Sequence, residues 1–301
     1  LAIDKRWYFI LVFSLVSQFF AGHAQISFYF ILMIIVYAVM RKKTGLRFIL
    51  LLSLVALITA VQWIPLLDWI RQSSRVIDGA DFTKEGWFIP WAHIVQFVAP
   101  DFFGNPTTLN YWGKWNYGEF VGYIGILPLA FAFIATFSPP FKKYRFWIGA
   151  GGIALLFAFP TPIAYIPFIL KVPILSSLQP TRLLFIVDFS LAVLAAFGCQ
   201  TVLEGSKKGR WVSVIALIGV IFAILWGVSI VGSLEVSTRN LVLPTVVFFV
   251  GATLIIIYQH IKHVTKFGNI VTCSFVGLVA VDLLRFGWKF TPFTAKQYFF
   301  H

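Results

Sequence analysis

The stretch from residue 211 to residue 232 reads WVSVIALIGVIFAILWGVSIVG and contains no charged side chain. A helix of about 20 apolar residues is long enough to cross the hydrocarbon core of a bilayer, so this stretch predicts a transmembrane helix. A second stretch of the same kind, LVLPTVVFFVGATLIIIY at 241–258, follows shortly after it. Together they predict a protein that crosses the membrane more than once.

The composition of the whole chain supports this prediction. Of its 301 residues, 59% are hydrophobic and 12% are charged, and a soluble domain carries about twice that charged fraction. The mean hydropathy is +0.88. These values exclude a soluble globular enzyme, a disordered tail and a disulfide scaffold. Aromatic residues make up 18% of the chain, which is typical of wide aromatic belts at the membrane interfaces.

We therefore expect an all-α, polytopic bundle of about nine transmembrane helices. The predicted spans are 7–20, 26–40, 46–67, 120–138, 146–159, 183–203, 211–232, 241–258 and 270–284. The first two are short for a full crossing and flank the sequence Ala-Gly-His-Ala-Gln at 21–25. A hairpin that dips into the bilayer is the alternative to two separate spans there.

Basic residues gather at alternate ends of the predicted spans. If all nine segments cross, one side carries 14 Lys and Arg with 2 Asp and Glu, a net charge of +12. The other side carries 10 Lys and Arg with 9 Asp and Glu, a net charge of +1. The positive-inside rule places the more basic side in the cytoplasm. Because the net charge of +13 sorts by membrane side, we expect no nucleic-acid partner.

One polytopic membrane domain is expected over 1–288, and residues 289–301 begin an extracytoplasmic region. The long 68–119 loop and the proline-rich segment 160–182 lie on the extracytoplasmic side in this topology. Five prolines break the second segment, and irregular backbone at membrane depth survives only where protein buries it or where it lines a wet cavity. We expect a re-entrant or interfacial piece that frames a site.

The 68–119 loop interleaves aromatic rings with amides and carboxylates, notably around Asp101 and Tyr111. Aromatic faces and polar groups of this kind suit a sugar ring and its hydroxyls, but they also occur in any loop at a membrane interface. Arg75 follows the third span, and its planar guanidinium suits phosphate. The alternative is that this arginine is an interfacial anchor.

Other polar residues stand near the predicted span ends. Arg182 precedes a helix that carries Asp188, which is either a functional group or half of an ion pair between helices. His23 and Gln25 lie in a turn between two helices. Asp282 and Arg285 are three residues apart, so we expect them to pair locally as structural residues. The spacing of His, Cys and acidic residues indicates no metal site, and cofactors, a divalent metal included, are left open.

Several short blocks resemble the YfhO-like bacterial membrane proteins. They include Gly-His-Ala-Gln at 22–25, with Ala24 where the family has proline, and Pro-Leu-Leu at 65–67 followed by Ser-Arg at 74–75. Further blocks in the same order are Pro-Asp-Phe-Phe-Gly at 100–104, Tyr-Trp-Gly at 111–113, Tyr-Ile-Gly-Ile-Leu-Pro-Leu at 123–129, Pro-Thr-Arg at 180–182 and Val-Asp-Leu-Leu-Arg-Phe at 281–286.

This resemblance implies a GT-C-type glycosyltransferase of a bacterial plasma membrane. Such an enzyme moves a sugar from a polyprenyl-phosphate carrier to an extracytoplasmic polymer, of the teichoic-acid type in Gram-positive relatives, or to a glycolipid. Its partners are then the bilayer, the lipid-linked sugar and that acceptor. We expect Arg75 and Arg182 to contact the lipid phosphate. We expect His23, Gln25, Asp101 and Tyr111 to contact the sugar or the acceptor.

Family members usually carry the catalytic carboxylate in a first extracytoplasmic loop, which would lie upstream of Leu1. The chain opens on leucine rather than methionine, and we expect it to be a piece of a longer protein that is inactive alone. Two other functions remain open on this sequence. One is a transporter or flippase of lipid-linked sugars, and the other is a membrane assembly protein without catalysis.

Overall fold

The computed structural model describes residues 5–72, 82–114, 116–139, 141–172, 175–205, 208–261 and 265–290. All regular structure in these ranges is helical, and no strand occurs among them, which confirms the predicted all-α class for the described part of the chain. The chain divides into two compact units. The first contains Leu1–Phe88 and Ala154–Ile186, and the second contains Ile89–Ile153 and Val187–His301.

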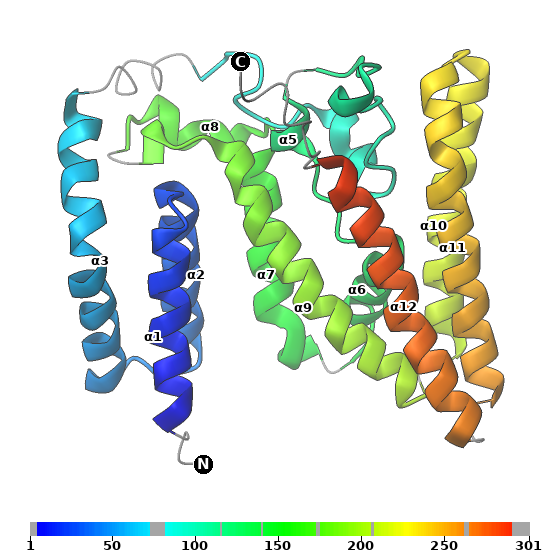
Figure 1. Ribbon diagram of the computed structural model, residues 1–301, viewed down its shortest axis with the longest axis horizontal. Helices are drawn as coiled ribbons and strands as arrows, with labels where there is room; N and C mark the ends of the chain where they lie inside the picture. Colours follow the sequence, from blue (N-terminus) through cyan, green and yellow to red (C-terminus); the bar gives the residue numbers. More distant parts are fainter. Residues whose placement is uncertain are drawn as a thin grey trace, which may run out of the picture. The chain divides into compact units, whose positions relative to one another are not determined.

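The first unit is built on three apolar helices, which Figure 1 draws in blue to cyan. Helix α1 (Lys5–Phe20) packs against α2 (Ala24–Met40) and α3 (Leu46–Gln72). The unit also holds helix α8 (Pro162–Ile169) and two short 3-10 turns, Leu175–Ser177 and Pro180–Leu183. Thr161 caps α8 by accepting a hydrogen bond from the Ala164 amide at 3.2 Å, as expected for threonine before a helical proline.

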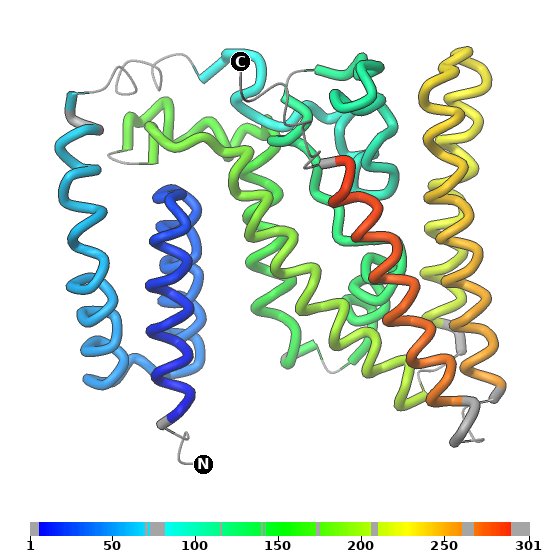
Figure 2. Tube along the Cα trace, viewed as in Figure 1, coloured from blue at the N-terminus to red at the C-terminus, as the bar shows by residue number. Residues whose placement is uncertain are grey.

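The second unit is centred on the short helix α6 (Ile126–Thr136). Eight of its eleven residues are buried, because it packs against α10 (Lys208–Val231), α11 (Glu235–Ile261) and α12 (Thr265–Phe290). The trace in Figure 2 shows α11 and α12 running along most of this unit. Two further helices, α7 (Phe141–Ala158) and α9 (Leu184–Leu203), lie mostly in the same unit.

A close backbone approach joins α9 to α6. A Cβ atom on Gly198 would stand 1.8 Å from the carbonyl oxygen of Phe131, so a side chain at this position is excluded without moving one helix. Small residues allow helices to pack this closely in membrane proteins. The approach therefore depends on glycine at 198.

Between residues 89 and 125 the described chain forms short helical turns instead of long helices. These are the 3-10 helices Trp91–Phe97 and Pro106–Thr108 and the single turn α5 (Tyr117–Phe120). Their apolar side chains are buried together with those of α6 in the core of the second unit; they include Val95, Val98, Ala99, Phe102, Phe103, Tyr117 and Val121. The segment is thus an integral layer of the unit.

Five described helices are long and apolar enough to cross a membrane. They are Leu46–Trp69, Pro180–Leu203, Arg210–Val231, Glu235–His260 and Gly268–Lys289. A sixth crossing is formed if Lys143–Ala158 and Pro162–Ile169, which are bent by 69° at their break, count as one span or a re-entrant piece. The structure thus supports a multi-pass membrane protein.

The count of nine spans stays a prediction. Every predicted span contains a helix, but Arg6–Phe20, Ala24–Met40 and Ile126–Thr136 are short. At 1.5 Å per residue α6 is only about 17 Å long, against a hydrocarbon core of about 30 Å. The predicted 120–138 span is shortened because residues 121–125 have no regular secondary structure and α6 begins only at Ile126.

A histidine is buried in the second unit. His93 is 1% exposed and stacks on Phe103 at 4.5 Å between ring centroids. Its Nδ1 lies 2.6 Å from Gln96 Oε1, while Gln96 Nε2 donates to the Pro100 carbonyl. The amide oxygen must therefore accept from Nδ1–H. Burial lowers the pKa of His93 below its ordinary value of 6.5.

We expect the free energy of unfolding to fall as the pH drops below about 6.5. In that range His93 binds a proton in the unfolded chain but not in the folded protein. The stability is therefore full at a pH above the pKa of His93 in the unfolded chain, and it is lost as the pH falls towards the lower pKa of His93 in the folded protein. Thermal unfolding of the purified protein at pH 7.5 and pH 5 measures this loss. The loss of stability between pH 7.5 and pH 5 should be smaller in His93→Gln. It should persist in His260→Gln, which replaces an exposed histidine. Equal losses in the natural protein and in both variants would show that His93 is not the group responsible.

Candidate functional site

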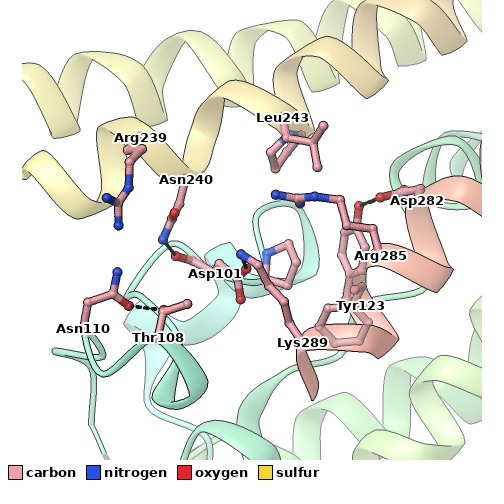
Figure 3. Close-up of a pocket in the computed structure, with 13 residues that line it drawn as sticks. Asp101, Thr108, Asn110, Tyr123, Arg239, Asn240, Leu243, Asp282, Arg285 and Lys289 are labelled. Atoms are coloured by element: carbon pink, nitrogen blue, oxygen red, sulfur yellow. Dashed lines mark hydrogen bonds and ion pairs between the residues drawn. The ribbon is translucent and has the colours of Figure 1, made fainter. Parts of the chain in front are cut away.

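A polar pocket of about 400 Å³ opens in the second unit, where α11 begins and α12 ends. Figure 3 shows its lining side chains converging from these two helices and from the segment that precedes α6. The pocket is lined by Pro100, Asp101, Thr108, Asn110, Tyr123, Arg239, Asn240, Leu243, Pro244, Asp282, Arg285, Phe286 and Lys289. We refer to this set as the polar pocket.

Two side chains near the start of α11 hold one wall of the polar pocket. Asn240 Nδ2 donates to the carbonyl oxygen of Asp101 at 2.6 Å. Ser237, which is fully buried, donates to the carbonyl oxygen of Phe102 at 2.7 Å. Both hydrogen bonds hold the backbone at Asp101 and Phe102 against helix α11, so this segment has a fixed position at the mouth of the polar pocket.

Asp101 is the polar centre of this wall. Its Oδ1 accepts hydrogen bonds from Asn105 Nδ2 and from the Tyr117 hydroxyl, each at 2.8 Å. Its Oδ2 lies 3.1 Å from Lys289 Nζ in an ion pair whose side chains are 12% and 28% exposed. Burial, with the neighbouring Asp101 charge second, raises the pKa of Tyr117. The Asp101 carboxylate thus links the turn at Asn105, helix α5 and the end of α12.

Asp282 closes the opposite wall. It is 5% exposed, and both its oxygens accept from the Tyr123 hydroxyl at 2.8 Å. Oδ2 also accepts from the Ile126 amide, the first of α6, at 3.2 Å. Burial raises the pKa of Tyr123, so this phenol stays a donor. Gly125, at a φ of +94°, leaves room for the carboxylate, since a Cβ atom there would stand 3.3 Å from Oδ2.

The expected local pair between Asp282 and Arg285 is not formed. Among the described residues the salt bridge at the pocket is that between Lys289 and Asp101. The carboxylate of Asp282 is directed to Tyr123 and to the start of α6, because hydrogen bonds to buried donors hold it inside the unit. The guanidinium of Arg285 is left at the exposed side of the pocket.

Two arginines give the polar pocket its cationic character. Arg239 on α11 and Arg285 on α12 are exposed, and neither forms a hydrogen bond or an ion pair with another residue of the described ranges. Figure 3 shows them on different helices, with Asn240 and Asp101 between them. With Lys289 they outnumber the two carboxylates, and both carboxylates are already engaged. The pocket therefore favours an anionic ligand.

Three of the predicted site residues lie in the first unit. Arg182 donates through its guanidinium to Gln25 Oε1 at 3.1 Å. Gln25 Nε2 donates to the Gln179 carbonyl at 2.7 Å and to the Tyr29 hydroxyl at 3.0 Å. His23 caps α2, its Nδ1 accepting from the Ile26 amide at 3.4 Å. Gln25 and Arg182 are thus brought together from residues 157 apart in sequence.

The other predicted residues are divided between the second unit and the part of the chain that is not described. Asp101 lines the polar pocket. Tyr111 packs edge to face on Tyr117 at 5.6 Å and donates to the Lys114 carbonyl; burial raises its pKa to about 12. Tyr111 therefore supports the Asp101 wall through Tyr117 without lining the pocket. Arg75 lies outside the described residues.

Most of the pocket was missed from the sequence. Arg239 and Asn240 are two polar residues directly before the apolar run 241–258. Arg285 and Lys289 are four residues apart at the end of another predicted span. Residues at this spacing share one helix face. That pattern was a usable signal, but the sequence alone does not show that the two helix ends meet.

No group of three or more His, Cys, Asp or Glu side chains arranged to hold a metal ion occurs among the described residues. The pocket combines cations, amides and hydroxyls with carboxylates that are already hydrogen-bonded. These groups are suited to binding and orienting an anion. They are not a set of free oxygen ligands of the kind that a divalent cation prefers.

Comparison of the chain with protein-family models, with curated proteins and with solved structures finds no match. The resemblance to YfhO-like proteins accordingly stays a prediction. The function is argued below from the polar pocket and from the membrane-length helices that form it.

Proposed function

We propose that this protein is a membrane glycosyltransferase that moves a sugar from a polyprenyl-phosphate carrier to a polymer or glycolipid outside the membrane. The observation that carries the proposal is the pair Arg239 and Arg285, which face one polar pocket at the ends of two membrane-length helices. A lipid phosphate needs cations at this depth, where its tail can stay in the bilayer and its sugar can reach water.

The neutral groups of the pocket suit sugar hydroxyls. Asn110 Oδ1 accepts from Thr108 Oγ1 at 2.7 Å and from the Asn105 amide at 2.9 Å, which turns its Nδ2 towards the opening. Asn240 uses its Nδ2 on the Asp101 carbonyl, which leaves its Oδ1 as an acceptor. Within the described ranges neither Asn110 Nδ2 nor Asn240 Oδ1 has a hydrogen-bond partner. A hydroxyl can satisfy both a donor and an acceptor of this kind.

The roles of the charged residues follow from their contacts. Arg239 and Arg285 would hold the phosphate and stabilise the charge that develops on it when the sugar departs. Asp101 accepts two hydrogen bonds and forms an ion pair with Lys289, so it is a positioning residue. The carboxylate that takes the acceptor proton is not assigned to a residue of the polar pocket.

Transfer by the natural-length protein in membrane vesicles tests the proposal. A radiolabelled polyprenyl-phosphate sugar is added, and label is counted in polymer or glycolipid and in the remaining carrier. We expect Arg239→Ala and Arg285→Ala each to lower transfer about tenfold or more, since a hydrogen bond to a charged group contributes about 1.5–3 kcal/mol. Arg145→Ala removes an exposed arginine of α7 that lies outside the pocket and should leave transfer unchanged.

Two results would contradict the proposal. Label that changes leaflet while the sugar stays on its lipid would make the protein a flippase. Transfer that is equal in Arg239→Ala, Arg285→Ala and Arg145→Ala would remove the polar pocket from the reaction. Partial recovery by Arg239→Lys or Arg285→Lys would show that the positive charge matters beyond the shape of the guanidinium.

A further inference from the structure

Helix α9 carries a single charged side chain, Asp188, inside the membrane-length segment Pro180–Leu203. Asp188 is eight residues after Pro180, which places it about 12 Å along the helix at 1.5 Å per residue. At that depth a helix that crosses the bilayer has left the water. An acidic residue inside a membrane helix is costly to keep as an ion and usually marks a functional group.

The Asp188 carboxyl has no hydrogen-bond partner within the described part of the chain. Its Oδ1 atom is buried and unpartnered. Its Oδ2 atom also forms no bond with a described residue, but it is not enclosed, and the side chain as a whole is half-buried. The carboxyl therefore has one enclosed oxygen and one oxygen that is open at the surface of the protein.

No neighbouring cation balances this carboxyl among the described residues. Arg182, six residues before Asp188, donates to Gln25 Oε1 at 3.1 Å and forms no ion pair with Asp188. Tyr29, the titratable side chain closest to that contact, accepts a hydrogen bond from Gln25 Nε2. The ion pair between helices that the sequence left open for Asp188 is thus not formed in the described ranges.

The helix face that carries Asp188 is otherwise apolar. Residues three, four and seven positions away share that face. Of these, Leu184 and Ala195 are buried, and Leu191 packs against the apolar core of the second unit. Helix α6, which approaches α9 at Gly198, contains no titratable side chain. The surroundings of the carboxyl therefore offer no group that would stabilise its charge.

The charged and titratable groups of the other helices that contact α9 lie towards its far end. Lys143 Nζ is 4.8 Å from the ring centre of Phe197, and the Tyr144 ring packs on the same side chain at 5.0 Å. Tyr258 of α11 donates to a carbonyl in the last turn of α9 at 3.2 Å. Phe197 is nine residues after Asp188, about 13 Å along the helix. These contacts leave the Asp188 carboxyl uncompensated.

A carboxylate without a counter-ion is strongly disfavoured in a membrane, whereas the neutral acid is far less costly to bury. A proton removes the charge, and it needs no space at the enclosed Oδ1 atom because it can bind at Oδ2. We propose that Asp188 is a proton-binding site within the membrane. It holds its proton as a neutral carboxylic acid at neutral pH and exchanges that proton through Oδ2. Carboxyl groups of this kind relay protons in pumps and transporters, so the site goes beyond the sugar transfer proposed for the polar pocket.

Dicyclohexylcarbodiimide, an apolar reagent that enters membranes, tests the proposal on the natural-length protein in vesicles. A protonated carboxyl adds across one C=N bond of the reagent. Its proton goes to the nitrogen, its oxygen binds the carbon, and the adduct rearranges to a stable N-acylurea that peptide mass spectrometry locates. At pH 7.5 we expect Asp188 to react at least about tenfold faster than Glu204, because the membrane favours the neutral acid.

Glu204 is the matched control within the same chain. It is an exposed glutamate in the turn between α9 and α10, where it accepts from Gln200 Nε2 at 2.6 Å. A water-soluble carbodiimide should reverse the order and modify Glu204 before Asp188. Modification of Asp188 by the water-soluble reagent alone, or equal rates at both residues with the apolar reagent, would overturn the proposal.

Infrared difference spectroscopy gives a second measurement without a label. At pH 7.5 the natural protein should show the carbonyl band of a protonated carboxyl, shifted in heavy water, which Asp188→Asn lacks. Asparagine has the shape of the neutral acid, so this variant should keep the natural melting temperature. A difference spectrum that contains only carboxylate bands would show that Asp188 is ionised and would overturn the site. Neither measurement depends on sugar transfer, so failure here is distinguishable from failure of the proposed reaction.

Discussion

The Asp282→Ala variant is expected to be less stable than the natural protein by about 2–6 kcal/mol, which is the scale for leaving two buried donors without an acceptor. The substitution leaves the Tyr123 hydroxyl and the Ile126 amide buried without their acceptor. Each such orphaned group costs about 1–3 kcal/mol. The measurement is thermal unfolding of the protein in detergent, followed by tryptophan fluorescence.

Two substitutions serve as controls for Asp282→Ala. Asp282→Asn keeps an oxygen that accepts from Tyr123, so we expect it to recover a large part of the lost stability. Asp188→Asn changes another carboxylate of a membrane-length helix. The Oδ1 atom of Asp188 is buried and has no hydrogen-bond partner among the described residues, so this substitution should not destabilise the protein. A melting temperature for Asp282→Ala within a degree or two of that of the natural protein would show that this contact is not structural.

The Asp101→Ala variant is expected to lose both stability and sugar transfer. It leaves Lys289 unpaired and removes the acceptor that Asn105 and Tyr117 share. We expect a loss of about 2–4 kcal/mol in the free energy of unfolding, between the values for an exposed and a fully buried ion pair. Transfer should fall with it, because Asp101 holds the loop at the mouth of the polar pocket.

A double-mutant cycle of Asp101→Asn and Lys289→Ala isolates the ion pair from the hydrogen bonds. Asn at 101 can still accept from Tyr117, so this cycle removes the charge contact while keeping the acceptor. We expect a coupling energy of about 1 kcal/mol. A coupling near zero, together with full transfer in Asp101→Ala, would show that the Asp101 wall does not organise the pocket.

The helices of this protein could be predicted from its sequence because long apolar runs have few structural alternatives in a membrane. The runs at 211–232 and 241–258 reappear in α10 and α11 with modest changes at their ends. The segment at 120–138 was harder to predict. Its apolar content is continuous, but Asp282 caps a helix that begins at Ile126, and this contact comes from a residue far along the chain.

The candidate site was predictable only in part, for the same reason. Asp101 was expected to contact a ligand and lines the polar pocket. Gln25 and Arg182 were both expected at a site, and they do meet. Arg239 was not singled out in the sequence. Its role depends on where α11 begins relative to the end of α12, and no local pattern specifies that relation.

The contact between Asp282 and the Ile126 amide has a consequence for how the protein is made. The two residues are 156 positions apart, and a ribosome adds about 5–20 residues per second. The amide at the start of helix α6 therefore stays without the Asp282 carboxylate for roughly 8–31 s while the rest of the chain is synthesised and inserted. A nascent chain that stalls before α12 keeps an open amide and an uncovered apolar helix, the kind of defect by which insertion chaperones and membrane proteases recognise an unfinished product.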